Sequence, residues 1–283
     1  TRHALALTAQ RFYGDPSARM DVVGITGTNG KTTTTYLLDS IMRHAGKKTG
    51  VIGTVATCIG DEQIQASRTT PESAELQKLL AEMADSHVEH VSMEVSSHAI
   101  DLSRIDGVTF GAVAFTNLTQ DHLDYHRSME NYLAAKKRLF TDFKVKARVI
   151  DINTDVGLRL ASELSADYDI LTVGCAEEAS IRAKKIEPQP HGTYFTLDTP
   201  TGEAYVTLPL PGAYNVDNAL VAAGCAYGLG IDVETIAEAL SEAPQVPGRL
   251  ERIIAGQPFE VVVDYAHTPD SLEKALKAMR AAT

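Results

Sequence analysis

The sequence has few cysteines, no long apolar run and no excess of positive charge, and each absence excludes a class of protein. Its three cysteines, Cys58, Cys175 and Cys225, are odd in number and show no C-x-x-C spacing. This pattern favours buried thiols in a reducing cytoplasm over disulfides or zinc ligands. No segment resembles a signal peptide or has the roughly 20 apolar residues of a membrane-spanning helix. We therefore expect a cytoplasmic protein without membrane insertion.

The balance of charge is acidic. A net charge of −11 and a pI of about 5.3 argue against a protein that binds nucleic acid or acidic lipid. Any anionic ligand must then be held by local positive groups. The length of 283 residues predicts one large domain and a piece of another. The chain starts with Thr1 rather than Met, so we expect a trimmed N-terminus.

The segment GITGTNGKTT, residues 24–33, predicts a phosphate-binding loop. A buried strand (22–25) precedes it and a helix (32–44) follows, so glycines would turn backbone N–H groups and the helix N-terminus toward an anion. Lys31 would reach the β- and γ-phosphates of a nucleotide, and the Thr32 hydroxyl would hold Mg²⁺. The spacing departs from G-x-x-x-x-G-K-[ST], because the first glycine comes one residue early. The alternative is a glycine-rich turn with a solvated lysine.

The remaining pattern predicts an α/β fold, a P-loop-containing, mostly parallel sheet flanked by helices. Nearly continuous apolar strands separated by helices are typical of parallel sheets covered on both faces, and functional groups then lie at the carboxyl ends of the strands. Between residues 168 and 211, short alternating segments predict a small antiparallel subsheet. The expected strands are 48–55, 88–95, 110–116 and 147–152, the expected helices are 71–85, 128–143 and 153–164, and the antiparallel segments are 170–173, 181–186, 193–197 and 204–208.

Polar clusters follow two of these strands. One begins at Glu94, and the other runs from Thr116 to His126. Glu94 and His122 are suitable Mg²⁺ ligands beside a nucleotide. A zinc site at His122 and His126 is the alternative, although the sequence has no H-E-x-x-H pattern.

Some polar residues in the sequence can be explained by structure alone, without a role in function. Thr70 and Pro71 fit the cap and first position of the helix 71–85. Lys136 belongs to a basic run on the helix 128–143, and such a run usually forms a solvated face. His87 and His90 are expected on the surface.

The C-terminal third contains another candidate group. Asn215 and Asn218 share one face in the first turn of a helix, where they would cap it or hydrogen-bond to a ligand. A tight turn then presents Arg249. A last strand (259–263) and one helix resemble the beginning of a further domain.

Taken together, these motifs resemble the Mur ligase family, in particular its MurE type, the UDP-N-acetylmuramoyl-tripeptide synthetases of peptidoglycan synthesis. The resemblance covers nearly the whole chain, in family order. The motifs that carry it are TGTNGKTT (26–33), RTTP (68–71), EVSSH (94–98), TN (116–117), DHLDYH (121–126), AAK (134–136), YNVDN (214–218), GR (248–249) and DYAH (264–267).

This resemblance implies a three-domain enzyme. Residues 1–19 would be the remnant of an N-terminal region or linker, 20–253 the central ATP-binding domain, and 254–283 the start of a truncated C-terminal ligase domain. ATP would phosphorylate the terminal carboxylate of UDP-MurNAc-L-Ala-D-Glu, and the amine of a diamino acid would then displace phosphate. Meso-diaminopimelate is the commoner amino acid and L-lysine the alternative, and the fragment alone would not complete ligation. We expect a monomer.

The resemblance also implies roles for individual residues. Lys136 matches the carbamylated lysine of the family, which replaces our interpretation of it as a solvated side chain. Its carbamate would hold the second of two Mg²⁺ ions. Leu102 departs from the family pattern, so a substrate contact there is in doubt. The catalytic residues would be Lys31, Glu94, His122 and Lys136; the nucleotide-binding residues Gly27, Thr28, Asn29, Gly30, Lys31, Thr32, Thr33, Asn117, Asn215, Asn218 and Arg249; the metal ligands Thr32, Glu94, His122 and Lys136; and the dipeptide contacts Thr69, Thr70, Ser96 and Arg104.

Two alternatives stay open. A ligase of the folylpolyglutamate or cyanophycin type shares the ATPase core, although the EVSSH and DYAH motifs argue against it. A non-catalytic nucleotide-binding module would need the loop but not Glu94, His122 or Lys136.

Overall fold

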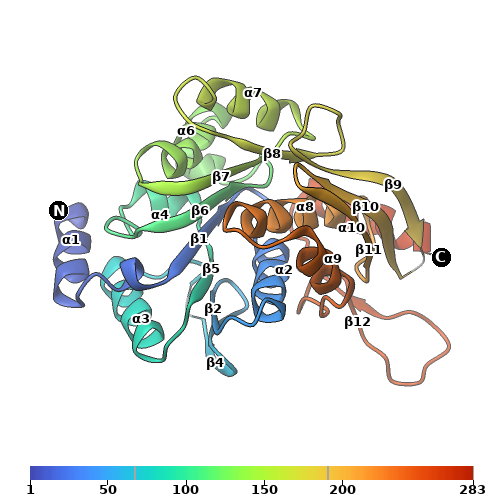
Figure 1. Cartoon of the computed structure of the whole chain (residues 1–283), viewed down its shortest axis with the longest axis horizontal. Coiled ribbons are helices and arrows are strands. Elements are labelled where there is room, and N and C mark those ends of the chain that lie inside the picture. The colour runs from blue at the N-terminus through green and yellow to red at the C-terminus, as the bar shows by residue number, and fades with distance from the viewer. Residues whose placement is uncertain (67, 190, 283) are drawn as a thin grey trace.

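The computed structural model describes residues 1–66, 68–189 and 191–282. Within them, one mixed sheet of 11 strands runs in the order β11-β10-β9-β8-β7-β6-β1-β5-β2-β3-β4, and helices pack on both of its faces (Figure 1). No helix in this described part of the chain is long and apolar enough to cross a membrane.

The middle of the sheet is parallel, as the apolar segments predict. Its central strand β1 pairs with β5 on one side and β6 on the other. Successive side chains of β1 enter opposite cores, Val23 and Ile25 on one face and Val22 on the other, which explains why the strand is apolar throughout. The parallel strands are β1 (Asp21–Thr26), β2 (Thr49–Ile52), β5 (His90–Glu94), β6 (Phe110–Phe115), β7 (Val145–Asp151) and β8 (Leu171–Gly174).

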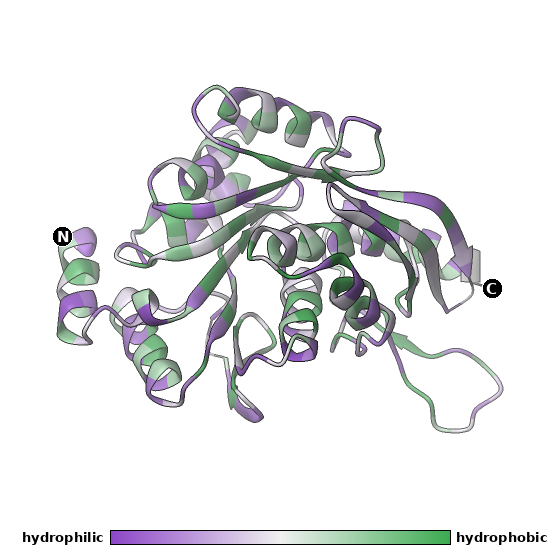
Figure 2. Ribbon diagram, in the orientation of Figure 1, coloured by the Kyte–Doolittle hydropathy of each residue, from purple (hydrophilic) through white to green (hydrophobic). Residues whose placement is uncertain are grey.

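Helices cover the two faces as separate layers. One layer contains α2 (Lys31–His44), α8 (Ala213–Gly228) and α9 (Val233–Ser241). The other contains α3 (Ser73–Asp85), α4 (Ser97–Asp101), α6 (Met129–Thr141) and α7 (Asp155–Leu164). Along α7, hydrophobic and hydrophilic residues alternate in Figure 2, as expected for a helix with one buried face. The N-terminal helix α1 (Arg2–Phe12) packs against α3, a 3₁₀ turn follows at Pro16–Arg19, and the short α5 spans Leu123–His126.

Antiparallel strands extend both edges of the sheet. On one side β9 (Ile181–Gln189), β10 (Gly192–Thr199) and β11 (Gly202–Leu208) form the predicted antiparallel part, and on the other β3 (Ala56–Ile59) and β4 (Glu62–Gln65) form a hairpin with β2. One detail differs from the prediction. The segment 170–173 contributes β8, which pairs in parallel with β7 and β9. The antiparallel strands therefore continue the main sheet.

The last part of the chain is built separately. β12 (Glu251–Arg252) and β13 (Val262–Val263) form a two-stranded sheet of their own, followed by α10 (Pro269–Ala282). Leu250, Ala275 and Ala278 make a third, small core here. The predicted strand 259–263 is thus reduced to two residues.

Two local predictions were wrong. Helix α3 begins at Ser73 with Glu72 as its N-cap, so Thr70 and Pro71 precede the helix. His90 is fully buried rather than exposed. Its Nε2 lies 2.8 Å from the Ser92 hydroxyl, and burial lowers the pKa of His90 to about 3. By contrast, Ser128 caps α6 as predicted, accepting a hydrogen bond from Asn131 N.

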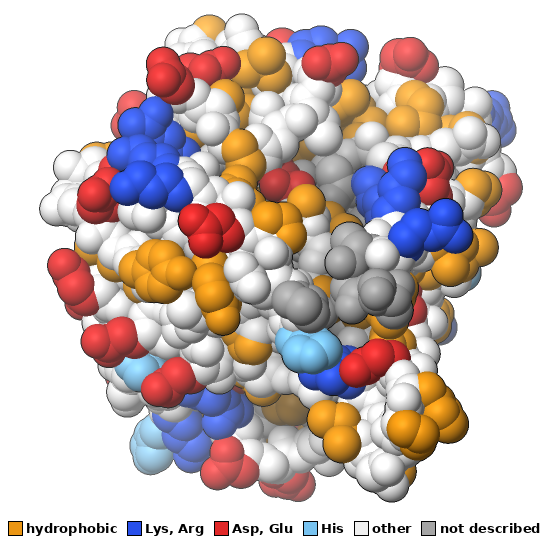
Figure 3. Space-filling model, turned by 90° about the vertical axis from the view of Figure 1, so that its right-hand side faces the viewer, with side chains coloured by type: hydrophobic (Ala, Val, Ile, Leu, Met, Phe, Trp, Pro, Cys, Tyr) orange, Lys and Arg blue, Asp and Glu red, His pale blue; other side chains and the backbone are white. Residues whose placement is uncertain are grey.

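Charged side chains of both signs are interspersed on the face shown in Figure 3. The basic side chains form separate groups among acidic ones on this face. This distribution fits the acidic net charge and differs from the continuous basic surface that binds nucleic acid.

Candidate functional site

A pocket of about 370 Å³ lies at the carboxyl ends of the parallel strands. The loop Gly27–Gly30 joins β1 to α2, and its residues Thr28, Asn29 and Gly30 line the pocket. Gly27 and Gly30 have φ values of 150° and 87°, and a Cβ at either position would collide with Thr116 or Asn218. Both positions therefore require glycine. The resulting cradle of backbone N–H groups at a helix N-terminus fits a phosphate.

Lys31 folds back over this loop. Its Nζ donates hydrogen bonds to Gly27 O (3.0 Å) and Thr28 O (2.7 Å). Burial lowers the pKa of Lys31, and the carboxylates of Glu94 and Asp121 oppose that shift. The lysine is therefore held beside the phosphate cradle by carbonyl groups that an anion could replace.

Glu94, at the end of β5, is 1% exposed and collects three hydrogen bonds. Its Oε1 accepts from Thr32 Oγ1 (3.0 Å) and Thr54 N (2.8 Å), and its Oε2 accepts from Thr54 Oγ1 (3.1 Å). Thr32 Oγ1 also accepts from Arg249 Nη2 at 2.9 Å. A hydroxyl and a carboxylate side by side at the cradle are oxygen ligands of the kind that Mg²⁺ prefers.

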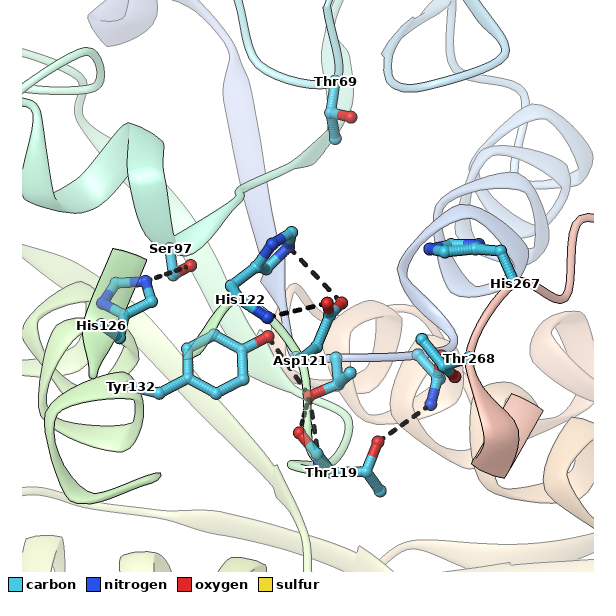
Figure 4. A network of polar contacts seen from close by, with 12 residues as sticks. Thr69, Ser97, Thr119, Asp121, His122, His126, Tyr132, His267 and Thr268 are labelled. Atoms are coloured by element: carbon cyan, nitrogen blue, oxygen red, sulfur yellow. Dashed lines mark hydrogen bonds and ion pairs between the residues drawn. The ribbon is translucent and has the colours of Figure 1, made fainter. Parts of the chain in front are cut away.

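Asp121 and His122 follow β6 on the other side of the loop (Figure 4). Asp121 accepts from His122 N at 2.8 Å, and its second oxygen lies 3.5 Å from His122 Nε2. Burial lowers the pKa of His122, and Lys136 and Lys31 lower it further against the opposing effect of Asp121. A neutral imidazole at the pocket is able to act as a metal ligand.

His126 does not share the site of His122. It is buried, its Nε2 lies 2.9 Å from Ser97 Oγ, and its ring stacks on Tyr132 (Figure 4). Among the residues that the structure describes, no group of three His, Cys, Asp or Glu side chains is arranged to hold a metal. The zinc interpretation of His122 and His126 therefore lacks support.

The environment of Lys136 differs most from what the spacing of residues predicted, which was a solvated side chain. The side chain is 1% exposed, its Nζ donates to Gly27 O at 2.8 Å, and it lies 4.5 Å from the centre of the Tyr132 ring. Burial, with Lys31 close by, lowers the pKa of Lys136 well below its ordinary value. The next two residues of the basic run do point outward, with Lys137 paired to Glu163 and Arg138 to Asp142.

The predicted dipeptide contacts divide into two groups. Thr69 and Ser96 line the pocket. Thr70 supports it from behind, donating to Glu94 O (2.9 Å) and accepting from Ser96 N (3.1 Å). Arg104 Nη1 donates to Thr70 O at 3.3 Å. Among the residues predicted for the site, Gly27, Thr70, Arg104 and Lys136 are not part of the pocket lining, and neither is Leu102.

The far end of the pocket contains the predicted asparagines. Asn215 Nδ2 donates to Pro211 O (2.7 Å), and Asn218 Nδ2 donates to Asn215 Oδ1 (3.1 Å). Asn117 is part of the same lining, and its Oδ1 accepts from Asn29 N at 3.0 Å. These side chains thus lie where a nucleotide could reach them.

Sequence reasoning missed two carboxylates beside these asparagines. Asp151 and Asp217 both line the pocket and are bridged by Asn153, whose N donates to Asp151 Oδ1 (2.9 Å) and whose Nδ2 donates to Asp217 Oδ1 (2.6 Å). Burial, together with Asp217, raises the pKa of Asp151 to about 7, and burial also raises the pKa of Asp217. Asp151 ends a parallel strand, so the rule that favours strand ends could have found it.

Residues 248–282 close the pocket from the opposite side. Arg249, His267 and Lys274 belong to its lining, and His267 lies across from His122 in Figure 4. Asp270 in the first turn of α10 accepts from Asn29 Nδ2 (3.0 Å) and pairs with Lys274 (2.9 Å). The phosphate-binding loop and the C-terminal segment therefore contact each other directly.

Two family models match the chain. The Mur ligase middle domain matches residues 25–226, and the Mur ligase glutamate ligase domain matches residues 248–283. Among curated proteins, the UDP-N-acetylmuramoyl-L-alanyl-D-glutamate--2,6-diaminopimelate ligase of Geobacillus thermodenitrificans is 45% identical over 285 residues, covering 99% of this chain and 58% of that protein. The ligase of the same name from Alkaliphilus metalliredigens is 41% identical, covering 100% of this chain and 57% of that protein. The chain thus spans less than two thirds of the length of these relatives.

Solved structures give the same result. A structure described as a UDP-N-acetylmuramoyl-L-alanyl-D-glutamate--2,6-diaminopimelate ligase superposes with a TM-score of 0.80 at 30% identity, covering 92% of this chain and 54% of that one. The folylpolyglutamate synthase of Mycobacterium tuberculosis superposes with a TM-score of 0.82 at 18% identity, covering 100% of this chain and 70% of that one, which shows a shared fold alone. With the middle-domain model matching well over half of its residues, this chain belongs to the Mur ligase family.

Proposed function

We propose that this chain is the nucleotide-binding part of an ATP-dependent amide ligase of peptidoglycan precursor synthesis. The ligase would join a diamino acid, meso-diaminopimelate, to UDP-MurNAc-L-Ala-D-Glu. The observation that carries the proposal is that Lys31, Glu94 and His122 line one pocket while buried Lys136 lies behind its loop and donates to Gly27 O, in a chain 45% identical to a protein named as a diaminopimelate ligase. A nucleotide-binding module would have no need to bury Lys136 beside the loop.

In this proposal residues 1–19 precede the central domain, 20–253 form it, and 254–283 begin the C-terminal ligase domain. The relatives are longer than this chain, so the diamino acid would be bound by parts of the protein beyond these residues. The enzyme would act as a monomer in the cytoplasm.

In the first step of the proposed reaction, an anionic carboxylate must approach the anionic triphosphate of ATP. In the second step, the activated carboxyl group forms an amide with an amine. The terminal carboxylate of the dipeptide attacks the γ-phosphorus of ATP, and ADP leaves. The amine of the diamino acid then attacks the acyl carbon of the resulting acyl phosphate, so that the amide bond forms while inorganic phosphate leaves and the amine loses a proton. Positive groups must offset the charge that accumulates during phosphoryl transfer. Lys31 and the N–H groups of Gly30–Thr33 would bind the phosphates, with Gly27, Thr28 and Asn29 shaping the loop around them. Arg249 would approach the phosphates from the C-terminal segment, and Asn117, Asn215 and Asn218 would contact the nucleoside.

Mg²⁺ supplies further charge neutralisation when it is bound. Thr32 and Glu94, which already share a hydrogen bond, would hold one ion, and His122 and a carbamate on Lys136 would serve the second. Carbamylation forms a bond between the neutral Lys136 amine and CO₂ and releases a proton. An ordinary lysine is almost entirely protonated near neutral pH, and the lowered pKa of Lys136 supplies the reactive amine. Crystal density that shows a bare amine with two metals bound would contradict the carbamate.

On the substrate side, Thr69 and Ser96 would contact the dipeptide from the pocket lining. Thr70 and Arg104 would contribute from behind it, since the Thr70 hydroxyl bonds to the backbone of Glu94 and Ser96.

The test is phosphate release by the full-length ligase that contains this chain. MgATP and UDP-MurNAc-L-Ala-D-Glu are supplied with either meso-diaminopimelate or L-lysine. We expect release that depends on the nucleotide dipeptide and on meso-diaminopimelate. Release only with L-lysine would change the amino acid, and no release with either, while ATP still binds, would favour a folylpolyglutamate- or cyanophycin-type ligase or a non-catalytic module.

A further inference from the structure

Thr54 lies in the turn between β2 and β3 and holds both carboxylate oxygens of Glu94. Its backbone N donates to Oε1 at 2.8 Å, and its hydroxyl donates to Oε2 at 3.1 Å. The preceding residue, Gly53, allows this close approach, because a Cβ at that position would collide with Glu94 Oε1. The turn is therefore built around the carboxylate.

The hydroxyl of Thr54 also meets Thr69, one of the proposed dipeptide contacts, with the two oxygens 3.0 Å apart. A threonine hydroxyl has one proton to donate, and that of Thr54 goes to Glu94. Thr69 therefore supplies the proton of the bond between the two hydroxyls. The result is a directed chain of hydrogen bonds from Thr69 through Thr54 to Glu94, which fixes the rotation of the Thr69 hydroxyl.

All three members of this chain face the same cavity. Thr54, Thr69 and Glu94 line the pocket, and Glu94 is one of the ligands proposed for Mg²⁺. Thr70 fixes the adjoining backbone, since its hydroxyl donates to Glu94 O at 2.9 Å. A carboxylate suited to a metal and a hydroxyl suited to the substrate thus share one support, and that support is the hydroxyl of Thr54.

The partners of a metal ligand orient it and tune its affinity, and their loss commonly weakens metal binding 10- to 100-fold. Thr54 has this relation to Glu94, and through the same hydroxyl it also holds Thr69. Removing the hydroxyl would leave the backbone bond to Glu94 Oε1 in place, take away the bond to Oε2 and let the Thr69 hydroxyl rotate. The loss would therefore be felt in two subsites that bind different ligands.

We propose that Thr54 is a positioning residue that aligns Glu94 for Mg²⁺ and Thr69 for the dipeptide, so that one hydroxyl supports both subsites. The inference rests on the proposed function. Thr54 acts through these two side chains rather than on the reacting atoms. Binding of a metal-free nucleotide depends on the phosphate-binding loop and is left intact when the Thr54 hydroxyl is lost.

The test uses the full-length ligase with Thr54→Val, which keeps the shape of the side chain and removes its hydroxyl. Binding is measured without turnover, by electron paramagnetic resonance for Mn²⁺ with a non-hydrolysable ATP analogue and by calorimetry for UDP-MurNAc-L-Ala-D-Glu. We expect the Kd for Mn²⁺ to rise about 10-fold. The Kd for the dipeptide should rise roughly 3- to 10-fold, as for the loss of about one hydrogen bond. Tm and the Kd for the metal-free analogue should change little.

Further variants separate the two halves of the proposal. Thr54→Ser keeps the hydroxyl and should restore both affinities. Thr69→Val should weaken dipeptide binding alone. In the double variant of Thr54→Val and Thr69→Val, the dipeptide Kd should rise less than the product of the single effects, because both substitutions remove the same bond.

The matched control is Thr49→Val in β2, the strand that leads into the turn. The hydroxyl of Thr49 is buried and has no hydrogen-bond partner within the described chain, so its loss should leave both Kd values unchanged.

An unchanged Kd for either Mn²⁺ or the dipeptide in Thr54→Val would overturn the inference. So would a fall in Tm together with weaker binding of the metal-free analogue, because that combination indicates a purely structural role. In these cases the proposed function stands as long as the wild-type ligase shows dipeptide-dependent phosphate release. If the wild-type enzyme shows no such release, the proposed function fails and this inference fails with it.

Discussion

The two sides of the pocket differ in how they are built. The strand-end side is formed by the end of β5 and by the residues that follow β1, β6 and β7, with Lys136 of α6 behind it. Its centre is buried, because Glu94 and Lys136 are each 1% exposed, whereas the His122 side chain at its rim is 44% exposed. The C-terminal side, formed by residues 248–282, is open. Lys274 and Asp270 are 43% and 35% exposed there, and large apolar side chains such as Phe259, Tyr265 and Leu276 face solvent.

The bonds that hold each side differ as well. Backbone carbonyls, buried carboxylates and a parallel sheet fix the strand-end side before any ligand arrives. The C-terminal side reaches the loop through single side-chain bonds, from Arg249 to Thr32 and from Asn29 to Asp270. We infer that the first side carries the chemistry in a preorganised form, whereas the second can be displaced at small cost.

The largest effect is expected for Lys136, which is buried behind the strand-end side. Its substitution tests whether this lysine contributes to activity while lowering stability. Lys136→Met in the full-length ligase keeps the length of the side chain and removes the amine. We expect dipeptide-dependent phosphate release to fall by about 100-fold or more, as for the loss of a group that stabilises transition-state charge. Thermal stability should stay the same or rise, because the buried amino group of Lys136 gives up its hydration for one hydrogen bond.

Lys137→Met is the matched control for this prediction. Lys137 is the next residue of α6, is 35% exposed and pairs with Glu163 on the surface. Both phosphate release and Tm should remain near wild type. Wild-type turnover in the Lys136→Met enzyme would show that the burial of Lys136 is structural.

The second prediction concerns Asp151, a buried carboxyl group of the strand-end side, and the way in which it makes the stability of the chain depend on pH. Its pKa is raised to about 7 in the folded chain from an ordinary value of 3.8. The folded state therefore keeps a proton that the unfolded state has lost, and stability falls as the pH rises through this interval. Asp151→Asn removes the titration, and its amide oxygen can still accept from Asn153 N.

We expect the Asp151→Asn chain to be more stable than wild type at about pH 8, by on the order of 1–4 kcal/mol, with the difference shrinking as the pH falls toward 4. Urea unfolding at both pH values measures it. Asp155→Asn, at an exposed position in α7, serves as the control and should show no such trend. Equal stability of wild type and Asp151→Asn at every pH would mean that Asp151 is ionised at no cost.

A feature of the site could be predicted from the sequence when residues close to it in the chain encode it. The loop 24–33, Glu94 and the strand ends could be predicted, because a glycine turn between a strand and a helix is encoded by neighbouring residues. The burial of Lys136 could not be derived from spacing, since its basic neighbours Lys137 and Arg138 share its helix and only packing against the loop distinguishes it. The family resemblance supplied what the local pattern lacked.

The same reason accounts for the other misses. Thr70 has the composition of a helix cap, yet its hydroxyl bonds to the backbone of Glu94 and Ser96, far away in sequence. His90 is polar but starts a strand at the centre of the sheet. Asp151 and Asp217 meet only because α8 returns over β7. In each case a long-range contact decides the environment.

The smallest expected effect concerns the C-terminal side. Asp270→Ala in the full-length ligase removes the bond to Asn29 and the ion pair with Lys274. Because this pair is exposed, we expect Tm to change little, while the KM for MgATP rises roughly 3- to 10-fold, since about one hydrogen bond that holds this side against the loop is lost. Glu273→Ala, which breaks a pair with Lys277 on the outer surface of the same helix, should leave the KM unchanged. A fall in kcat as large as that of Lys136→Met would contradict the comparison, because it would mean that the exposed side is as much a part of the catalytic machinery as the buried one.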